Sequence, residues 1–464
     1  MNKPFDPLSL SEFARYYGFH YDCVDPFLLV EDVLVEMERG LRGADSSLPM
    51  IPAYISPVSR TTPGKTVIAL DAGGTNLRAA LVTFDENGRA VVGESRKAPM
   101  PGSQECLGAD AFFDEIAALA APLIEMAGDK VEGIGFCFSY HMEITKEADG
   151  VLIAFSKEVD APDVVGRAIG AGLREALVRR KVKVPGRIIL LNDTVATLLC
   201  GLSEIPVHGG LRRGEDRYGV EAGPMVGFIL GTGFNTAYPE RIIPKIGFDS
   251  PQNPQIVVCE TGNFAHRYMG FLDKEYDSTT KNPGAYTLEK ATSGAYLGPL
   301  SFHILKQAVK DGVLSFHRQD EFLAWPTMQT KDLNPFMHEP LARTGPIGEL
   351  FGSDERDALS SFVYLTSIVT ERAALLAAAV VAAAVEKAGA GYGSTRESDS
   401  HGYDPFVPVR VAVEGTTYMI YKGMRSALES YLHIMLNKDR PRSYAIAPVE
   451  QASLLGAAVA ALSE

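Results

Sequence analysis

Residues 66–84 read TVIALDAGGTNLRAALVTF, and this stretch decides the fold. A β-branched run precedes the segment Asp71–Asn76, and a second apolar run, 77–84, follows it. Two such runs around a glycine-rich segment predict a β-hairpin. Gly73 and Gly74 allow the backbone to approach a ligand closely, so successive amides could hold an anion such as phosphate. A plain tight hairpin with no ligand is the alternative.

The side chains of this first turn extend the phosphate interpretation. Thr75 and Asn76 add hydrogen-bond donors, and Arg78 adds a cation. Asp71 could orient a magnesium ion through the waters of that ion. The turn therefore predicts a site for a phosphate ligand with its metal.

A second stretch repeats the plan of the first. Residues 225–230 form an apolar run, Gly231-Thr232-Gly233 forms a turn, and residues 235–238 form another short strand. A short turn can need glycine for structural reasons alone. Two opposed hairpins, however, could grip the phosphate chain of ATP from both sides. The repeat predicts two related α/β units that face each other.

Asn192 and Asp193 follow a predicted strand over residues 187–191 and precede a predicted helix over 194–202. The carboxyl ends of strands face the ligand crevice in open α/β sheets. A hydroxyl that attacks phosphorus must lose its proton, and a carboxylate can accept it. Asp193 is therefore the candidate general base. Aspartate is also a common helix cap, and the local sequence leaves both interpretations open.

Other polar residues border apolar or glycine-rich stretches and could bind sugar hydroxyls. They are Ser139, Ser156, Lys157, Asn235, Glu260 and Glu289. Each of them alone is better explained as a turn or cap residue. A strand over residues 409–413 runs into Glu414-Gly415-Thr416-Thr417, a turn that could face an adenosine or be only a turn.

The remaining pattern predicts a chain that becomes more helical toward its end. Apolar periodicity indicates a buried strand over 131–138 and helices over the following ranges: 8–42 with an amphipathic part at 26–41, 110–127, 164–180, 297–311, 355–387, 421–436 and 452–462. The range 389–405 is rich in Gly, Ser and Asp and is interpreted as a mobile surface loop.

Composition narrows the class of protein. The chain has 464 residues, 46% of them hydrophobic, which predicts two domains. Its net charge of −14 argues against nucleic acid or an anionic membrane as a partner. The apolar run 373–385 is too short to span a bilayer and is interpreted as a buried helix. Five widely spaced cysteines without a CxxC pair, and an N-terminus without an evident signal peptide, predict a cytoplasmic protein.

The motifs, taken in order, resemble those of the eukaryotic-type hexokinase family, within the actin-like ATPase fold. The resemblance covers nearly the whole chain. It is carried by MERGL (37–41) with LPMIP (48–52), by 70–78, by FCFSY (136–140), by LNDTVATL (191–198), by ILGTGFNTAY (229–238), by EKATSGAYLG (289–298), by 411–418 and by SLLGAA (453–458).

The resemblance implies an α/β fold of two actin-like ATPase (ribonuclease H-like) domains, with mixed sheets flanked by helices and an interdomain cleft. The small domain would be 63–191 plus 447–464, and the large domain 1–62 plus 192–446. The implied activity is ATP-dependent phosphorylation of a hexose, with glucose expected, at its 6-hydroxyl, with domain closure on sugar binding. A catalytically weak sugar sensor is the alternative. Either would act as a monomer or weak homodimer.

The resemblance also assigns roles to residues. Asp193 would be the base, with Lys157 and Arg78 assisting catalysis. The hexose would be bound by Ser139, Ser156, Lys157, Asn192, Asp193, Asn235, Glu260 and Glu289. ATP and Mg²⁺ would be served by Asp71, Gly73, Gly74, Thr75, Asn76, Arg78, Gly231, Thr232, Gly233, Gly415 and Thr416, with Asp71 reaching the metal through water.

Three departures from the family pattern lie at the predicted sugar pocket. His141 stands where the family usually has proline, and the segment after Glu260 lacks the usual tryptophan. Residues 154–157 read AFSK in place of the usual Trp-Thr-Lys. These departures bear on which sugar is bound more than on the reaction.

Overall fold

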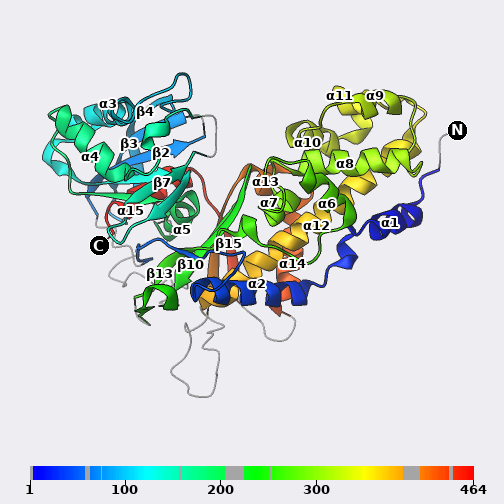
Figure 1. The fold of residues 1–464 in the computed structure, drawn as a ribbon, viewed down its shortest axis with the longest axis horizontal. Helices are drawn as coiled ribbons and strands as arrows, with labels where there is room; N and C mark the ends of the chain where they lie inside the picture. The colour runs from blue at the N-terminus through cyan, green and yellow to red at the C-terminus, as the bar shows by residue number, and fades with distance from the viewer. Residues whose placement is uncertain are drawn as a thin grey trace, which may run out of the picture.

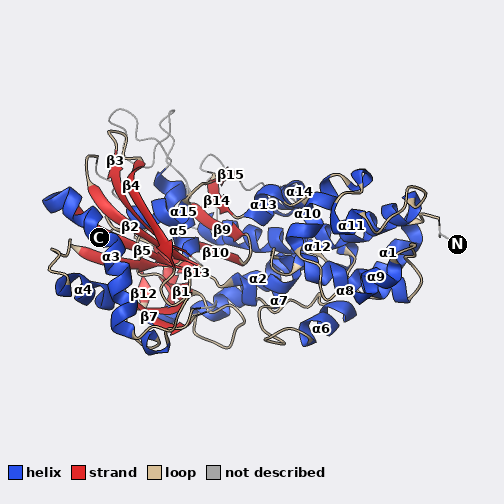
Figure 2. Cartoon of the chain, turned by 90° about the horizontal axis from the view of Figure 1, so that it is seen from above, coloured by secondary structure: helices blue, strands red, loops and turns tan. Residues whose placement is uncertain are grey.

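Two groups of elements, joined by a narrow middle, make up the elongated chain (Figure 1). The computed structural model describes residues 4–57, 63–74, 76–155, 159–203, 224–250, 253–389, 408–437 and 443–463. One end of the molecule is built around a mixed sheet, whereas the other end is mostly helical (Figure 2). A second mixed sheet lies between them.

The first sheet has five strands and contains the first glycine-rich turn. In spatial order they are β4 (Ala90–Pro99), β3 (Asn76–Phe84), β2 (Thr66–Gly73), β5 (Val131–Phe138) and β8 (Arg187–Leu191). β2 and β3 form the predicted antiparallel hairpin, in which Gly73 is opposite Asn76. β5 and β8 run parallel to β2, and α3 (Ala109–Ala127) and α4 (Ile169–Arg179) lie in the connections.

The second sheet repeats this connectivity. Its order is β1 (Ile51–Pro52), β13 (Gln255–Val258), β10 (Phe234–Glu240), β9 (Met225–Leu230), β14 (Val409–Glu414) and β15 (Tyr444–Pro448). β9 and β10 form an antiparallel hairpin, β13 pairs antiparallel with β10, and β14 and β15 continue in parallel from β9. Five strands of each sheet therefore follow one plan, which confirms the expectation of two related α/β units.

Two helices cross between the sheets. α5 (Asp193–Ser203) follows the last strand of the first sheet but packs on β9 and β14. α15 (Ala452–Ala460) follows the last strand of the second sheet but packs on β2 and β5. The packing needs glycine, because a Cβ at Gly135 would lie 1.7 Å from the Ala457 carbonyl oxygen, and one at Gly456 would lie 2.0 Å from that of Ala196. The exchange of helices ties the two units together.

The helical end is organised around α12 (Arg356–Gly389), whose neighbours are α2 (Pro26–Leu41) and α14 (Met424–Asn437) (Figure 1). α12 is long and apolar enough to cross a membrane, but 94% of its most apolar window is buried within the protein. Buried Arg372 of α12 makes two hydrogen bonds of 2.6 Å to the Asp273 carboxylate. α12 is thus a core helix, as the apolar run within it predicted.

The other helices cover this core. They are α1 (Pro7–Tyr16), α6 (Phe271–Ser278), α7 (Thr287–Thr292), α8 (Leu297–Lys310), α9 (Gln319–Ala324), α10 (Thr330–His338), α11 (Gly345–Gly348) and α13 (Thr416–Ile420). A two-stranded ribbon, β6 (His141–Ile144) with β7 (Gly150–Ala154), extends from the first sheet, and β11 (Ile242–Ile243) pairs with β12 (Phe248–Asp249).

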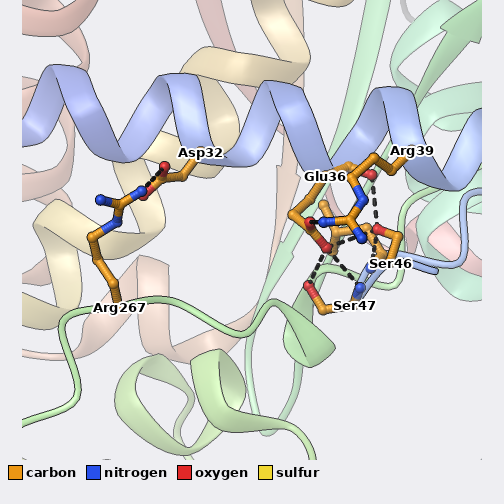
Figure 3. A network of polar contacts seen from close by, with 7 residues as sticks. Asp32, Glu36, Arg39, Ser46, Ser47 and Arg267 are labelled. Atoms are coloured by element: carbon orange, nitrogen blue, oxygen red, sulfur yellow. Dashed lines mark hydrogen bonds and ion pairs between the residues drawn. The ribbon is translucent and has the colours of Figure 1, made fainter. Parts of the chain in front are cut away.

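Glu36 connects α2 to Ser46 and Ser47, which lie in the segment before β1 (Figure 3). Its carboxylate accepts hydrogen bonds from the Ser47 backbone amide (2.7 Å) and from the hydroxyls of Ser46 (2.9 Å) and Ser47 (3.0 Å), and it pairs with Arg39 (2.9 Å). One turn earlier on α2, Asp32 pairs with Arg267. The contacts of Glu36 with Ser46 and Ser47 thus hold the segment before the short edge strand β1 against α2.

Three predicted helices differ from the structure by more than two residues at an end or are divided. The range 8–42 is divided by a bend at Gly18, whose φ is +77°, and by a short 3-10 turn. The helix predicted from residue 164 begins at Ile169, after another 3-10 turn and Gly166 with φ +83°. The helix predicted at 421–436 begins at Met424. The predicted loop 389–405 lies almost wholly outside the described residues.

All five cysteines are free thiols. Cys137, Cys200 and Cys259 are buried, whereas Cys23 and Cys106 are exposed.

Candidate active site

Asp193 is the first residue of α5, at the edge where β8 ends. The residue before the helix is Asn192, and its side-chain oxygen accepts a 2.7 Å hydrogen bond from the Thr194 backbone amide. This is the geometry of an N-cap. Asn192, and not Asp193, therefore caps α5.

Asn235, Glu260 and Glu289 lie together beside β10. The Asn235 amide nitrogen donates to a Glu260 carboxylate oxygen at 3.1 Å, and the Phe234 backbone amide donates to Glu289 at 3.2 Å. The Asn235 side-chain oxygen accepts from the Thr236 backbone amide at 2.8 Å. These contacts orient two carboxylates and one amide from β10, from the loop after β13 and from α7.

The charge of Asp193 acts on both glutamates. Burial raises the pKa of Glu260 to about 7, and the negative charge of Asp193 adds to this rise while the Asn235 hydrogen bond opposes it. Burial also raises the pKa of Glu289, and Asp193 again contributes. Like charges raise a carboxyl pKa only at short range. Three carboxylates therefore share one region, where they can accept hydrogen bonds from adjacent hydroxyls.

The first turn leaves room above its glycine. A Cβ at Gly73 would meet only a carboxylate oxygen of Asp71, 4.0 Å away, and no left-handed backbone angle requires glycine there. The packing of the chain itself thus gives no reason for glycine at this position. Arg78 is exposed and lies opposite Asp71 in the register of β2 with β3, and Asn76 is half-buried. Thr75 lies outside the described residues.

The second turn adjoins the predicted adenosine turn. The Thr417 hydroxyl and the Gly294 backbone amide each donate to the Gly231 carbonyl oxygen at 2.8 Å. A Cβ at Gly231 would lie 3.4 Å from Cα of Gly415. Gly415 itself needs glycine, because its φ is +126° and a Cβ would lie 2.3 Å from the Leu230 carbonyl oxygen. Two turns far apart in sequence thus form one surface.

Thr232, Gly233 and Thr416 complete this surface. Thr232 and Thr416 are exposed, and the Thr232 carbonyl oxygen accepts from the Ala295 backbone amide at 3.1 Å. A Cβ at Gly233 would lie 3.2 Å from a Glu289 carboxylate oxygen. The second turn is therefore continuous with the group of carboxylates.

Glu414 connects the first turn to the rest of the site. Burial raises its pKa to about 7, and the charges of Asp193 and Asp71 add to the rise, while hydrogen bonds from the Ala452 backbone amide and the Thr197 hydroxyl oppose it. Asp71 on β2 and Asp193 at the start of α5 thus both act on the Glu414 carboxyl group. Sequence reasoning gave Glu414 no role, although its place at the end of a buried strand was a usable signal.

Ser139 lies beside the first turn. Its backbone amide donates to the Ala72 carbonyl oxygen at 3.2 Å, which extends the pairing of β5 with β2 by one residue. The neighbouring Cys137 is buried, which raises the pKa of its thiol, and the charges of Asp71 and Asp193 add to the effect. His141 begins β6 and is exposed. Ser156 and Lys157 lie outside the described residues.

Comparison with known families decides what these turns and carboxylates belong to. A family model described as hexokinase matches residues 225–463, just over half of the chain, and a second hexokinase model matches residues 22–202. The chain belongs to the hexokinase family. This hexokinase is therefore an enzyme of ATP-dependent sugar phosphorylation, as its motifs predicted.

Relatives of this hexokinase match along almost its entire length. Hexokinase-7 of Oryza sativa is 28% identical over 95% of this chain and 94% of its own. Hexokinase-2 of Solanum tuberosum is 29% identical over 94% of this chain and 87% of its own.

Two solved hexokinase structures share the fold. One hexokinase crystal structure matches with a TM-score of 0.75 and 23% identity, covering 98% of this chain and 99% of the other. The glucose complex of the Schistosoma mansoni hexokinase matches with a TM-score of 0.70 and 22% identity, covering 99% and 100%. The expected actin-like ATPase fold is confirmed.

Proposed function

We propose that this hexokinase transfers the γ-phosphoryl group of ATP to the 6-hydroxyl of a hexose, with glucose as the preferred substrate and Asp193 as general base. The observation that carries the proposal is the position of Asp193. Its charge acts on Glu260 and Glu289, which belong to the proposed sugar set, and on Glu414, which precedes the turn at Gly415. A base for a sugar hydroxyl must lie between the sugar and the phosphate.

Phosphoryl transfer to a sugar requires that the hydroxyl be aligned with the phosphorus atom and that a group accept its proton. Phosphoryl transfer depends mainly on positioning and on the neutralisation of charge. In the proposed mechanism the 6-hydroxyl donates a hydrogen bond to the Asp193 carboxylate, which takes the proton as the oxygen attacks phosphorus. Lys157 and Arg78 stabilise the negative charge that develops on the transferred group.

The proposed sugar site uses groups whose hydrogen-bond capacity suits hydroxyls. The side-chain oxygen of Asn192 caps the helix, so its NH₂ group is the part that can bind sugar. Asn235, Glu260 and Glu289 supply an amide and two carboxylates. Ser139, Ser156 and Lys157 complete the proposed set. The rim of Glu260 and Glu289 accepts hydrogen bonds, which favours a ligand with several adjacent hydroxyls.

The proposed nucleotide site uses the two turns and the surface at Gly415. The open space at Gly73 supports close approach of a phosphate, and Gly74, Thr75, Asn76, Gly231, Thr232, Gly233 and Thr416 would supply amides and hydroxyls. Over the described ranges, no three or more His, Cys, Asp or Glu side chains are grouped to hold a metal ion. This suits Mg²⁺, which is usually held by substrate phosphates with few protein ligands. Asp71 would hold it through water, and the ion would neutralise phosphate charge.

We further propose that 63–191 with 447–464 and 1–62 with 192–446 act as small and large domains that close on the sugar. Closure would remove water, which competes with the sugar as acceptor. The crossing of α5 and α15 between the sheets supports a hinge at that place. Free cysteines throughout support a reducing, cytoplasmic location. We propose a monomer or weak homodimer.

A coupled assay of ATP consumption tests the proposal. We expect little consumption without sugar and a large increase with glucose, with the product phosphorylated at the 6-hydroxyl. A panel of hexoses under the same conditions ranks the substrates. Glucose binding without turnover, at any Mg²⁺ concentration, would instead identify a sugar sensor and refute the proposed enzyme.

A further inference from the structure

Tyr140 connects the segment that carries Ser139 to the first turn. It follows Ser139 directly after β5, and its phenol hydroxyl donates a 3.2 Å hydrogen bond to the carbonyl oxygen of Gly74. Gly74 belongs to the turn proposed to bind phosphate, and Ser139 to the set proposed to bind sugar. The Tyr140 side chain therefore links the segment proposed to bind sugar to the turn proposed to bind phosphate.

The ring of Tyr140 is held firmly. Its side chain is 5% exposed, and the ring lies 4.9 Å from that of Phe138 and 5.2 Å from that of Phe155, at angles of 51° and 82°. Phe155 in turn lies 5.7 Å from the ring of Phe112 in α3. Such tilted and edge-to-face contacts restrict the direction of an aromatic side chain. A fixed ring keeps its hydroxyl directed at the carbonyl oxygen of Gly74.

Phe155 adds a third connection. It follows β7 directly and precedes, in sequence, Ser156 and Lys157, two further residues of the proposed sugar set. The ring of Tyr140 thus touches this segment while its hydroxyl reaches Gly74. Burial also raises the pKa of Tyr140 to about 12, so the phenol remains a donor at neutral pH.

We propose that the Tyr140 hydroxyl is a positioning group that couples the two substrates, because it holds the first phosphate turn in register with the sugar-binding segment. This inference rests on the proposed function. Sugar bound at Ser139 restrains the backbone that carries Tyr140, and the hydrogen bond passes this restraint to Gly74. The turn is then already ordered when ATP arrives. By linkage, each ligand must raise the affinity for the other by the same factor.

The test measures that factor by calorimetry. A non-hydrolysable ATP analogue with Mg²⁺ is titrated into the protein with and without glucose, and glucose is titrated with and without the analogue. Tyr140→Phe keeps the ring and removes only the hydroxyl. We expect it to weaken binding of the analogue to the glucose complex by about threefold to tenfold, the usual effect of one hydrogen bond. Glucose binding to the nucleotide-free protein should stay within twofold.

Tyr17→Phe is the matched control. Its phenol donates a 2.7 Å hydrogen bond to Asp311, but it lies next to α1, at the other end of the molecule from β2 and β3 (Figure 1). We expect it to leave the coupling factor unchanged. In the Tyr140→Phe variant, binding of glucose to the nucleotide-bound protein should weaken by the same factor as binding of the analogue to the glucose complex.

Three results would overturn the coupling role. In the first, neither ligand affects the other in the wild-type protein. In the second, Tyr140→Phe keeps the wild-type factor at an unchanged melting temperature. In the third, it keeps that factor at a lower melting temperature, which marks a structural role only. Failure of the proposed function is distinguishable, because it appears as wild-type protein that phosphorylates no hexose. The coupling measurement needs no turnover.

Discussion

The side-chain oxygen of Asn192 accepts a 2.7 Å hydrogen bond from the backbone amide of Thr194, so the residue between them, Asp193, starts the helix rather than precedes it. This relationship separates two roles that the sequence left open for Asp193, helix cap and general base. Asn192 caps α5, and Asp193 is presented at the positive end of the helix, where a carboxylate is stabilised. The two residues can therefore be tested separately.

Asp193→Ala should lower kcat by roughly 10²–10⁴, since the variant loses the proposed proton acceptor. Glucose affinity, measured by calorimetry, should change far less. A variant that keeps near-normal turnover would refute the assignment of the base.

Asn192→Ala should destabilise the protein by about 0.5–2 kcal/mol, because the helix loses its cap. Asn192→Asp retains an oxygen that can accept the hydrogen bond, so its stability should stay close to that of the wild type. Both variants lose the side-chain NH₂ group and should bind glucose more weakly. Denaturant unfolding and calorimetry together measure the two effects. Equal stability of Asn192→Ala and Asn192→Asp would contradict the capping role.

The stability of the ligand-free protein should depend on Glu260 between pH 4.5 and about 7. Burial raises the pKa of Glu260 in the folded state from 4.5 to about 7. In this interval the folded state binds more protons than the unfolded state, so the free energy of unfolding falls as pH rises. Glu260→Gln should remove about 1–3 kcal/mol of this fall. Unfolding by urea at pH 5 and pH 7.5 measures it.

The control for this prediction is Glu86→Gln, which removes an exposed carboxylate from a turn. It should leave the pH dependence as in the wild type. Glu414 and Glu289 also have raised pKa values and will contribute in the same direction. An identical pH dependence in Glu260→Gln and wild type would show that burial does not act on Glu260 as described.

Gly135→Ala should destabilise the protein by about 1–3 kcal/mol or more, because the new Cβ would meet the Ala457 backbone and push α15 away from the first sheet. Gly108→Ala is the matched control. Its Cβ would meet only Asp163, at 3.7 Å, and its φ of −68° suits alanine. Thermal unfolding of the two variants measures the difference. Similar melting temperatures would show that α15 can shift without cost.

Gly73→Ala should fold as well as the wild type, since the added methyl group meets no protein atom closer than 4.0 Å. It should nevertheless raise KM for ATP, because the methyl group occupies the space proposed for phosphate. KM for glucose should change little. Unchanged KM values for both substrates would count against the phosphate role of the first turn.

The local sequence was sufficient for the hairpins and for their place in the fold. The pattern of residues 66–84 and 225–240 gave two glycine turns between apolar runs, and both are hairpins in the structure. The start of α4 was predicted wrongly because Val164 ends a 3-10 turn, and Gly166, with φ +83°, separates this turn from the helix that begins at Ile169. Periodicity does not distinguish such a turn from the first turn of an α-helix.

The sequence by itself determined the family, the repeated strand plan and the residue types of the site, because these depend on local patterns and on the order of motifs. Only the tertiary structure decided which of those residues meet. Asp71 and Asp193 both act on Glu414, from positions more than 200 residues before it, and Tyr140 reaches Gly74 from a different strand. Such contacts arise where parallel strands and crossing helices bring chain ends to one edge, and no local pattern encodes that distance.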